Sequence, residues 1–167
     1  MRAHLLLSVP VFALACKKDP TKADVRKAAR AEGRYDLGDP GEGWKVGRPG
    51  GADKAWFHPV HGATIYTDSN CGSRYEDSPL PDLVTHLTYG IARGDAVSEQ
   101  SLRLDERDAL MRVYEGALDG VSVKVGALVT KKNRCTYDML FIAPPATFDA
   151  GWPDFVTVAE GFRVTGG

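Results

Sequence analysis

The strictest constraint on the fold of this chain is a segment near its middle in which apolar and polar residues alternate. Between residues 121 and 130 every second side chain is apolar: Val121, Val123, Val125, Ala127 and Val129 fall on one face, and Ser122, Lys124 and Thr130 on the other. A period of two places alternate side chains on opposite faces of a β-strand. The segment therefore predicts a strand with one buried face.

Turn signals lie on both sides of this strand. Asp119-Gly120 precedes it and the run 131–134 follows it, and both resemble the tight turns of β-hairpins. Strand-like segments continue beyond the turns, at residues 111–114 and 135–142. A fourth strand near Leu102 and Leu104 would be joined by a charged turn over residues 105–108. We expect a four-stranded antiparallel meander from Val97 to Ile142.

An earlier group of strands is predicted before the meander. Residues 44–46 and 55–60 read as a hairpin around the loop Arg48-Pro49-Gly50-Gly51, and a further strand follows from Ala63 to about Thr67.

Two helices complete the expected fold. Ser78-Pro79 is a helix entry, and an apolar face recurs at helical spacing up to a stop at Gly94: Leu80, Leu83, Val84, Leu87 and Ile91. A second helix runs from Trp152 to Ala159, with Gly161 as its C-terminal cap. The predicted fold class is α+β, an antiparallel sheet with an N-terminal hairpin, flanked by two main helices.

The N-terminus predicts export. Residues 1–15 combine Arg2, an apolar run from Leu5 and small residues before Cys16, which together make a secretory signal. The apolar run is shorter than the roughly 20 residues that a membrane-spanning helix needs.

The end of this signal resembles the lipobox of bacterial lipoproteins, carried by Ala13-Leu14-Ala15-Cys16. The resemblance implies cleavage before Cys16 and lipid on its sulfur, so that acyl chains anchor the protein in the membrane. In the alternative, the protein is secreted and soluble and Cys16 is incidental. Lys17 stands where some bacteria place an aspartate that retains lipoproteins in the inner membrane, which favours the outer membrane.

Residues 16–37 are expected to be a lipidated cysteine and a basic tether, followed by a single domain at 38–167. Basic residues outnumber acidic ones between 17 and 34, and large apolar residues are absent there. Such a tether would be drawn to anionic headgroups, or would act only as a solvated spacer.

The cysteine count supports an oxidising compartment. Once Cys16 is assigned to lipid, Cys71 and Cys135 remain as an even pair near two predicted strands. We predict a disulfide between them. The competing hypothesis, a catalytic Cys/His pair, lacks any local sequence signature.

The order of elements resembles the PsbP-like fold, an antiparallel sheet between helices. The residues that carry the resemblance are Trp44, the segments 56–65 and 114–142, and the helices 80–91 and 155–162. The family includes extrinsic photosystem subunits and many bacterial lipoproteins, and the resemblance implies a non-catalytic binding or assembly subunit. Fold alone does not define function.

Candidate sites are few. His58 and His61 could begin a metal site, with Asp53 or Asp68 as a third ligand, but surface-turn residues are the simpler interpretation. Trp44, Trp56 and Tyr66 could form a recognition surface, against the alternative that they pack in the core. No cofactor is predicted.

We therefore expect a membrane-anchored, periplasm-facing, non-catalytic lipoprotein that binds or assembles with an envelope protein. The alternatives are a small metal-dependent hydrolase using His58 and His61, and a purely structural envelope component. The formal net charge of −1 argues against a nucleic-acid partner.

Overall fold

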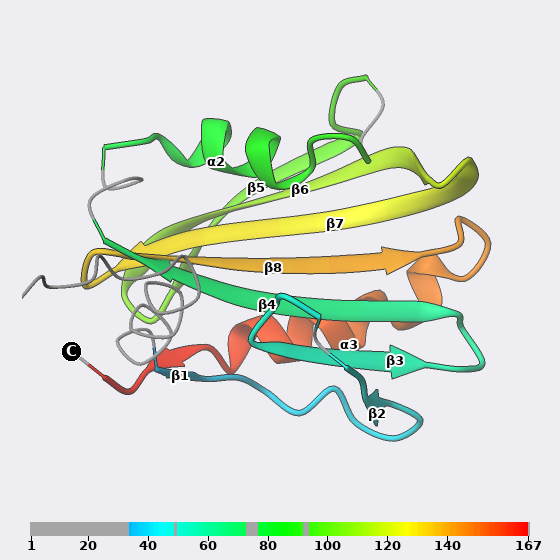
Figure 1. Cartoon of the computed structure of the whole chain (residues 1–167), viewed down its shortest axis with the longest axis horizontal. Helices are drawn as coiled ribbons and strands as arrows, with labels where there is room; N and C mark the ends of the chain where they lie inside the picture. The colour runs from blue at the N-terminus through cyan, green and yellow to red at the C-terminus, as the bar shows by residue number, and fades with distance from the viewer. Residues whose placement is uncertain (1–33, 49, 73–76, 92–93, 167) are drawn as a thin grey trace, which may run out of the picture.

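The computed structural model describes residues 34–48, 50–72, 77–91 and 94–166, so the predicted signal sequence and Cys16 lie outside the described residues. The described chain is an α+β domain in which an antiparallel sheet lies between two helices (Figure 1). In chain order the elements are β1 (Tyr35–Asp36), β2 (Lys45–Val46), β3 (Lys54–His58), β4 (Ala63–Cys71), α2 (Leu80–Leu87), β5 (Ser98–Leu104), β6 (Arg107–Leu118), β7 (Val121–Lys132), β8 (Cys135–Ala143), α3 (Phe148–Glu160) and β9 (Arg163–Val164).

The main sheet has the strand order β2-β3-β4-β8-β7-β6-β5, and its neighbouring pairs are all antiparallel. Strands β5 to β8 form the predicted meander. Its three turns have two residues each, all with positive φ: Asp105 and Glu106, Asp119 and Gly120, Asn133 and Arg134. Positive φ at both turn residues matches the twist of the flanking strands, so these turns fix the register.

The N-terminal hairpin joins the meander through β4 and β8. Eight residue pairs link these two strands, from Thr64 opposite Ile142 to Cys71 opposite Cys135. The last pair is the disulfide that the cysteine count predicts. Strand β4 thus runs four residues further than the predicted end near Thr67, because β8 offers partners as far as Cys135.

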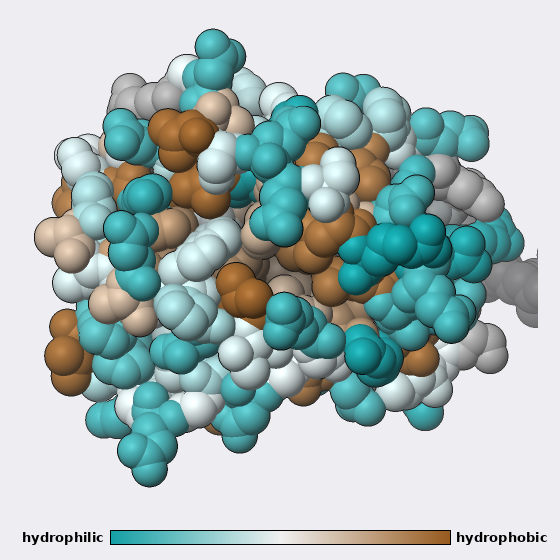
Figure 2. Space-filling model, turned by 180° about the vertical axis from the view of Figure 1, so that it is seen from behind, coloured by the Kyte–Doolittle hydropathy of each residue, from teal (hydrophilic) through white to brown (hydrophobic). Residues whose placement is uncertain are grey.

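The larger core lies between the sheet and α3. Phe141 of β8 packs against three aromatic rings of the helix, Phe148, Trp152 and Phe155. Gly126 of β7 lies under the Trp152 ring, and a Cβ atom there would collide with it. Figure 2 views this side of the molecule.

Helix α3 begins one turn before the predicted start, at Phe148. Gly161 does cap its C-terminus, but with a φ of −77°, so left-handed backbone is not the reason for glycine. The backbone of Gly38 lies directly against Gly161, and neither position has space for a Cβ atom. The Gly38 N–H donates to the Val158 carbonyl at 3.0 Å, which fixes this close contact.

Helix α2 covers part of the other face and packs on β6 and β7 through a smaller core built around Leu83, Val84, Leu110 and Tyr114. The predicted helix extended to Ile91, which is wrong by about one turn. It ends at Leu87 with Thr88 as the C-cap, and Gly90 then takes a φ of +84°, which turns the chain out of the helical conformation. Among the described residues no helix is long and apolar enough to cross a membrane.

The folded domain begins earlier than the predicted boundary at residue 38. Tyr35 pairs with Val164 in the two-stranded sheet β1–β9, and its ring is buried against Tyr137 and Phe162. Leu37 also packs at the edge of the core. At least residues 35–37 therefore belong to the domain, because they bury apolar surface.

The disulfide should contribute measurably to stability. Replacing Cys71 and Cys135 together by serine removes a crosslink between residues 64 positions apart. A crosslink that closes a loop of that length contributes about 4 kcal/mol to the free energy of unfolding. Urea denaturation measures the loss, and Ser101→Ala, at an exposed position on β5 away from the bridge, serves as the control. An unchanged midpoint in the double variant would contradict the prediction.

Candidate functional site

His58 and His61, considered above as metal ligands or as surface-turn residues, form a packed pair at the β3–β4 turn. His58 is buried, and its ring stacks on His61 with centroids 4.1 Å apart. The His61 backbone N–H donates to His58 Nδ1 at 3.2 Å, and Trp44 lies edge-on against the His58 ring. His58 thus shapes the turn and closes one end of the core.

This arrangement does not suit a metal ion. Nδ1 of His58 already accepts a hydrogen bond, and Nε2 lies against Gly43 where even a Cβ atom would not fit. Asp53 lies five residues away at the other end of β3, about 16 Å at the rise of a strand. In the described part of the chain, no three His, Cys, Asp or Glu side chains gather as metal ligands. The arrangement of His58 and His61 therefore does not support the metal-site hypothesis.

Trp44, Trp56 and Tyr66, considered above as a recognition surface, do not lie on one common surface. Trp56 pairs with Ile65 and packs on the core beneath the sheet, whereas Tyr66 is the next residue along β4 and faces the opposite side. Trp44 packs on Phe141, and its indole N–H donates to Asp154 Oδ2 at 2.9 Å. Both tryptophans therefore join the hairpin to the α3 layer.

A groove on the α3 side of the sheet is the best candidate for binding. It lies between the helix and strands β5 and β6, with a volume of about 570 Å³. Its apolar lining comprises Leu102, Leu104, Met111, Leu128, Trp152, Val156 and Ala159. In Figure 2 apolar side chains gather near the centre of this face, within a border of hydrophilic ones.

Charged residues border the groove at one end. Arg103, Glu106, Glu160 and Arg163 are exposed there, while Asp105 is held in place by Lys132 Nζ at 2.7 Å and by the Val164 N–H at 2.8 Å. The hydrogen bond from Lys132, reinforced by that from Val164, lowers the pKa of Asp105. Asp105 is therefore an ionised carboxylate that positions β9 and does not donate a proton.

The groove offers a surface on which a partner could bind. Its described lining residues include the carboxylates of Asp105, Glu106 and Glu160 but no serine, threonine, cysteine or histidine. One wall is β5, an edge strand that pairs with β6 alone among the described strands. Sequence patterning identifies Leu102 and Leu104 as inward-facing, but the opening depends on where α3 crosses the sheet, and no local pattern encodes that position.

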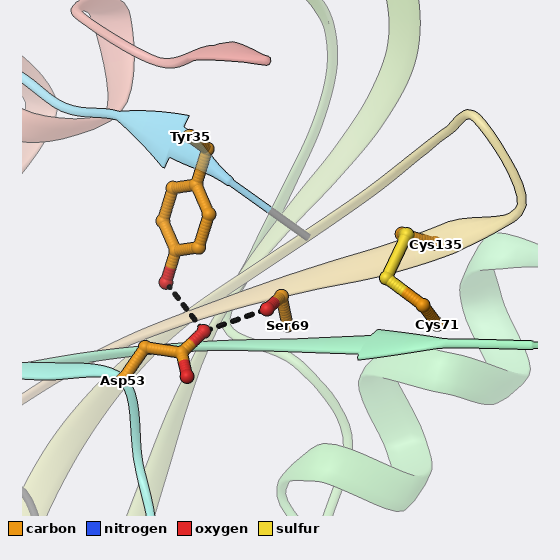
Figure 3. Close-up of a disulfide and its surroundings, with 5 residues drawn as sticks. All are labelled: Tyr35, Asp53, Ser69, Cys71 and Cys135. Carbon is orange, nitrogen blue, oxygen red and sulfur yellow. Dashed lines mark hydrogen bonds between the residues drawn. A yellow bond between two sulfur atoms is a disulfide. The ribbon is translucent and has the colours of Figure 1, made fainter. Parts of the chain in front are cut away.

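A polar cluster near the disulfide has a structural role (Figure 3). Tyr35 donates to Asp53 Oδ2 at 3.2 Å and shares a hydrogen bond with Thr67 at 2.9 Å, and Ser69 donates to the same Asp53 oxygen at 2.6 Å. Burial raises the pKa of Tyr35 well above its usual range, so the phenol stays neutral. The cluster fastens β1 to β3 and β4.

Two carboxylates face each other on the α2 side of the sheet. Asp138 of β8 lies directly opposite Asp68 of β4. Burial, and in second place the charge of Asp68, raises the pKa of Asp138 to about 7. Because the folded state then binds this proton more tightly than the unfolded chain, the associated stability is full below about pH 4 and is lost as the pH rises through 7.

We predict that Asp138→Asn flattens this pH dependence. The variant should gain on the order of 2 kcal/mol of unfolding free energy at pH 8 and little at pH 4. Urea unfolding across this range measures both. Glu115→Gln, at an exposed position on β6, is the control and should leave the slope unchanged. If the Asp138 variant kept the parent slope, the half-buried Asp138 carboxyl would not be the source of that slope.

Solved structures resemble this chain in fold. LpqN of Mycobacterium tuberculosis, described as involved in cell envelope biogenesis, matches 80% of this chain and 85% of its own, with a TM-score of 0.56 and 12% identity. The cyanobacterial PsbP protein of Synechocystis matches 74% of this chain and 82% of its own, with a TM-score of 0.53 and 13% identity. A Bacteroides thetaiotaomicron protein matches 80% of this chain and 48% of its own, with a TM-score of 0.53 and 9% identity.

No family model and no curated protein matches the sequence. The likeness therefore rests on architecture: an antiparallel sheet between two helices, in the element order that the sequence predicts. The chain has the PsbP-like fold.

Proposed function

We propose that this protein is a lipid-anchored, non-catalytic lipoprotein of the bacterial cell envelope that binds an envelope protein in the groove between α3 and β5. The observation that carries the proposal is the groove itself, an open trough with an apolar floor and a polar, charged border, one wall of which is an edge strand. The anchoring part rests on the sequence of residues 1–16.

Export and anchoring are supported by two features of the chain. The signal-like segment ends at Cys16 in a lipobox-like sequence, and the remaining cysteines form a disulfide, which is typical of oxidising compartments. Lys17 favours the outer membrane in the same proposal. The envelope role assigned to LpqN, which shares the fold, is consistent with it.

The groove fits an extended protein segment. An edge strand presents backbone N–H and C=O groups to which a further strand can bond, while pockets beside it select every second side chain. Leu102 of β5 and Met111 of β6 offer apolar contacts beneath that edge, and Arg103 and Glu106 supply charges at its end. We expect the partner segment to alternate apolar residues with polar ones.

A substitution on the helix wall tests this site. Val156→Glu places a charge among the apolar groove residues at a half-buried helical position, whereas Thr157→Glu adds the same charge at the adjacent exposed position. A photocrosslinker at Gln100, which lines the groove from β5, should capture one dominant envelope protein in intact cells. We expect Val156→Glu to reduce that adduct by roughly tenfold and Thr157→Glu to leave it unchanged, since a desolvated charge costs more than 1 kcal/mol.

Two results would count against the proposal. A crosslinked product that persists in the Val156→Glu protein would place the partner elsewhere. A product that disappears equally in both variants would show that added charge, rather than the groove, controls the contact. Retention of the disulfide and of the parent unfolding midpoint establishes that each variant is folded.

A further inference from the structure

We infer that the partner at the β5 edge is a second copy of this chain, paired antiparallel with β5 across a two-fold axis at Ser101. The inference deepens the proposed function, because it rests on β5 as the binding edge and identifies the protein that binds there. In such a dimer the two main sheets continue into one, and the same surface of each copy forms the contact.

Strand β5 is the long outer edge of the main sheet. It is the last strand at one side, and the strand at the other side, β2, has only two residues. Most β5 side chains are exposed, as expected of an edge that no described strand covers: Ser98, Glu99, Gln100, Ser101 and Arg103. An exposed edge of this kind is a template for pairing with another strand.

The hydrogen bonds of the β5–β6 hairpin determine which β5 residues can bond outward. Leu104 lies opposite Arg107 across a two-residue turn, so these two residues exchange backbone hydrogen bonds, and every second residue of β5 bonds to β6 in the same way. The Thr130 hydroxyl donates to the Asp108 carbonyl at 2.9 Å, so that carbonyl points toward β7, and the backbone of Arg103, opposite it, points away from β6. Three residues therefore direct their N–H and C=O groups out from the edge: Glu99, Ser101 and Arg103.

The side chains of these three residues lie on one face and carry unlike charges at the two ends. Arg112 Nε donates to Glu99 at 2.6 Å, and Arg103 lies 3.7 Å from Asp108. The Glu99 and Arg103 side chains are still 54% and 70% exposed, so both present charge at the edge. The edge is therefore negative at one end, neutral at Ser101 and positive at the other end.

A two-fold axis at Ser101 makes this edge complementary to itself. It places Glu99 opposite Arg103 of the second copy, and Ser101 opposite its own counterpart. The residues that face each other are then those with outward backbone groups, as an antiparallel ladder requires. Unlike charges alternate along one row across the joined sheets: Arg112 and Glu99, then Arg103 and Asp108 of the second copy. Unlike charges directly opposite each other stabilise a strand pair, and like charges destabilise it.

The neighbouring registers lack this complementarity. Moving the axis one residue toward the start of β5 places Glu99 opposite Ser101 and Arg103 opposite Val97. Moving it one residue toward the end of β5 places Glu99 opposite Asp105, which carries the same charge. An axis between two residues places outward backbone groups opposite inward ones. Charge and backbone pattern together select one register of β5 on itself, so the occupant to which we commit is a second copy.

Photocrosslinking between tagged copies identifies the partner. Two forms of the full chain with different tags are produced in the same cells, and one carries the photocrosslinker at Gln100, which would lie opposite Leu102 of the second copy. We expect an adduct that contains both tags. An adduct with a different protein would overturn the inference, and the groove proposal would stand if Val156→Glu still reduced that adduct. A two-tag adduct that Val156→Glu leaves unchanged would support the β5 pairing and contradict the groove proposal.

Charge reversals test the register. Glu99→Arg alone places two arginines opposite each other, and Arg103→Glu alone places two glutamates opposite each other, so each should reduce the two-tag adduct about tenfold. Producing the Glu99→Arg chain together with the Arg103→Glu chain should restore the adduct, because every contact between the two copies then joins unlike charges. Mixing cannot repair damage within one chain. Recovery therefore distinguishes pairing between copies from loss of the Arg112 or Asp108 contact.

A further variant and two controls complete the test. Ser101→Lys breaks no ion pair of the described structure but places two like charges at the axis, so it should also reduce the adduct about tenfold. Glu115→Arg on β6 and Lys45→Glu on β2 reverse exposed charges away from β5 and should leave the adduct unchanged.

Three results would overturn the inference: no recovery in the mixed variants, an unchanged adduct in Ser101→Lys, or an equal loss in the two controls. The parent unfolding midpoint establishes that each variant is folded. If a charge-reversed chain failed that criterion, the Ser101→Lys result would decide.

Discussion

The pairing of β4 with β8 is the contact on which the rest of the fold depends. These strands are distant in sequence, yet eight residue pairs join them at the centre of the sheet, ending in the disulfide. The N-terminal hairpin is attached on one side of this pair and the meander on the other. The pairing also decides which side chains lie under α3, because a shift by one residue would exchange the two faces.

The sequence predicts those parts of the fold in which each residue contributes to a periodic signal. The alternation around Val125 and the turn signals on both sides of it are enough to predict the meander, and the cysteine count is enough to predict the disulfide. The turns over 105–108 and 131–134 are predicted as four residues each, whereas each has two residues in the structure. Strands β1 and β9 are missed, because two residues carry no period and Tyr35 is buried only by long-range contacts. Similarly, Trp56 and Tyr66 fall on opposite faces through strand register, which local composition does not encode.

Most of the polar side chains described above hold strands and turns of the domain in place. Asp53 ties β1 to the sheet, Asp105 holds β9 to two turns, and His58 closes the β3–β4 turn. The groove beside β5 is the surface that our account proposes for interaction, on the α3 side of the sheet.

The central claim is that this domain is exported and held at a membrane by Cys16. Non-reducing mass analysis of the protein extracted from its native membrane tests the claim most directly. The account predicts a chain that begins at a lipid-modified Cys16, with the peptides of Cys71 and Cys135 linked. A chain that retains Met1 and carries free thiols would contradict it, and the groove would then need a partner outside the envelope.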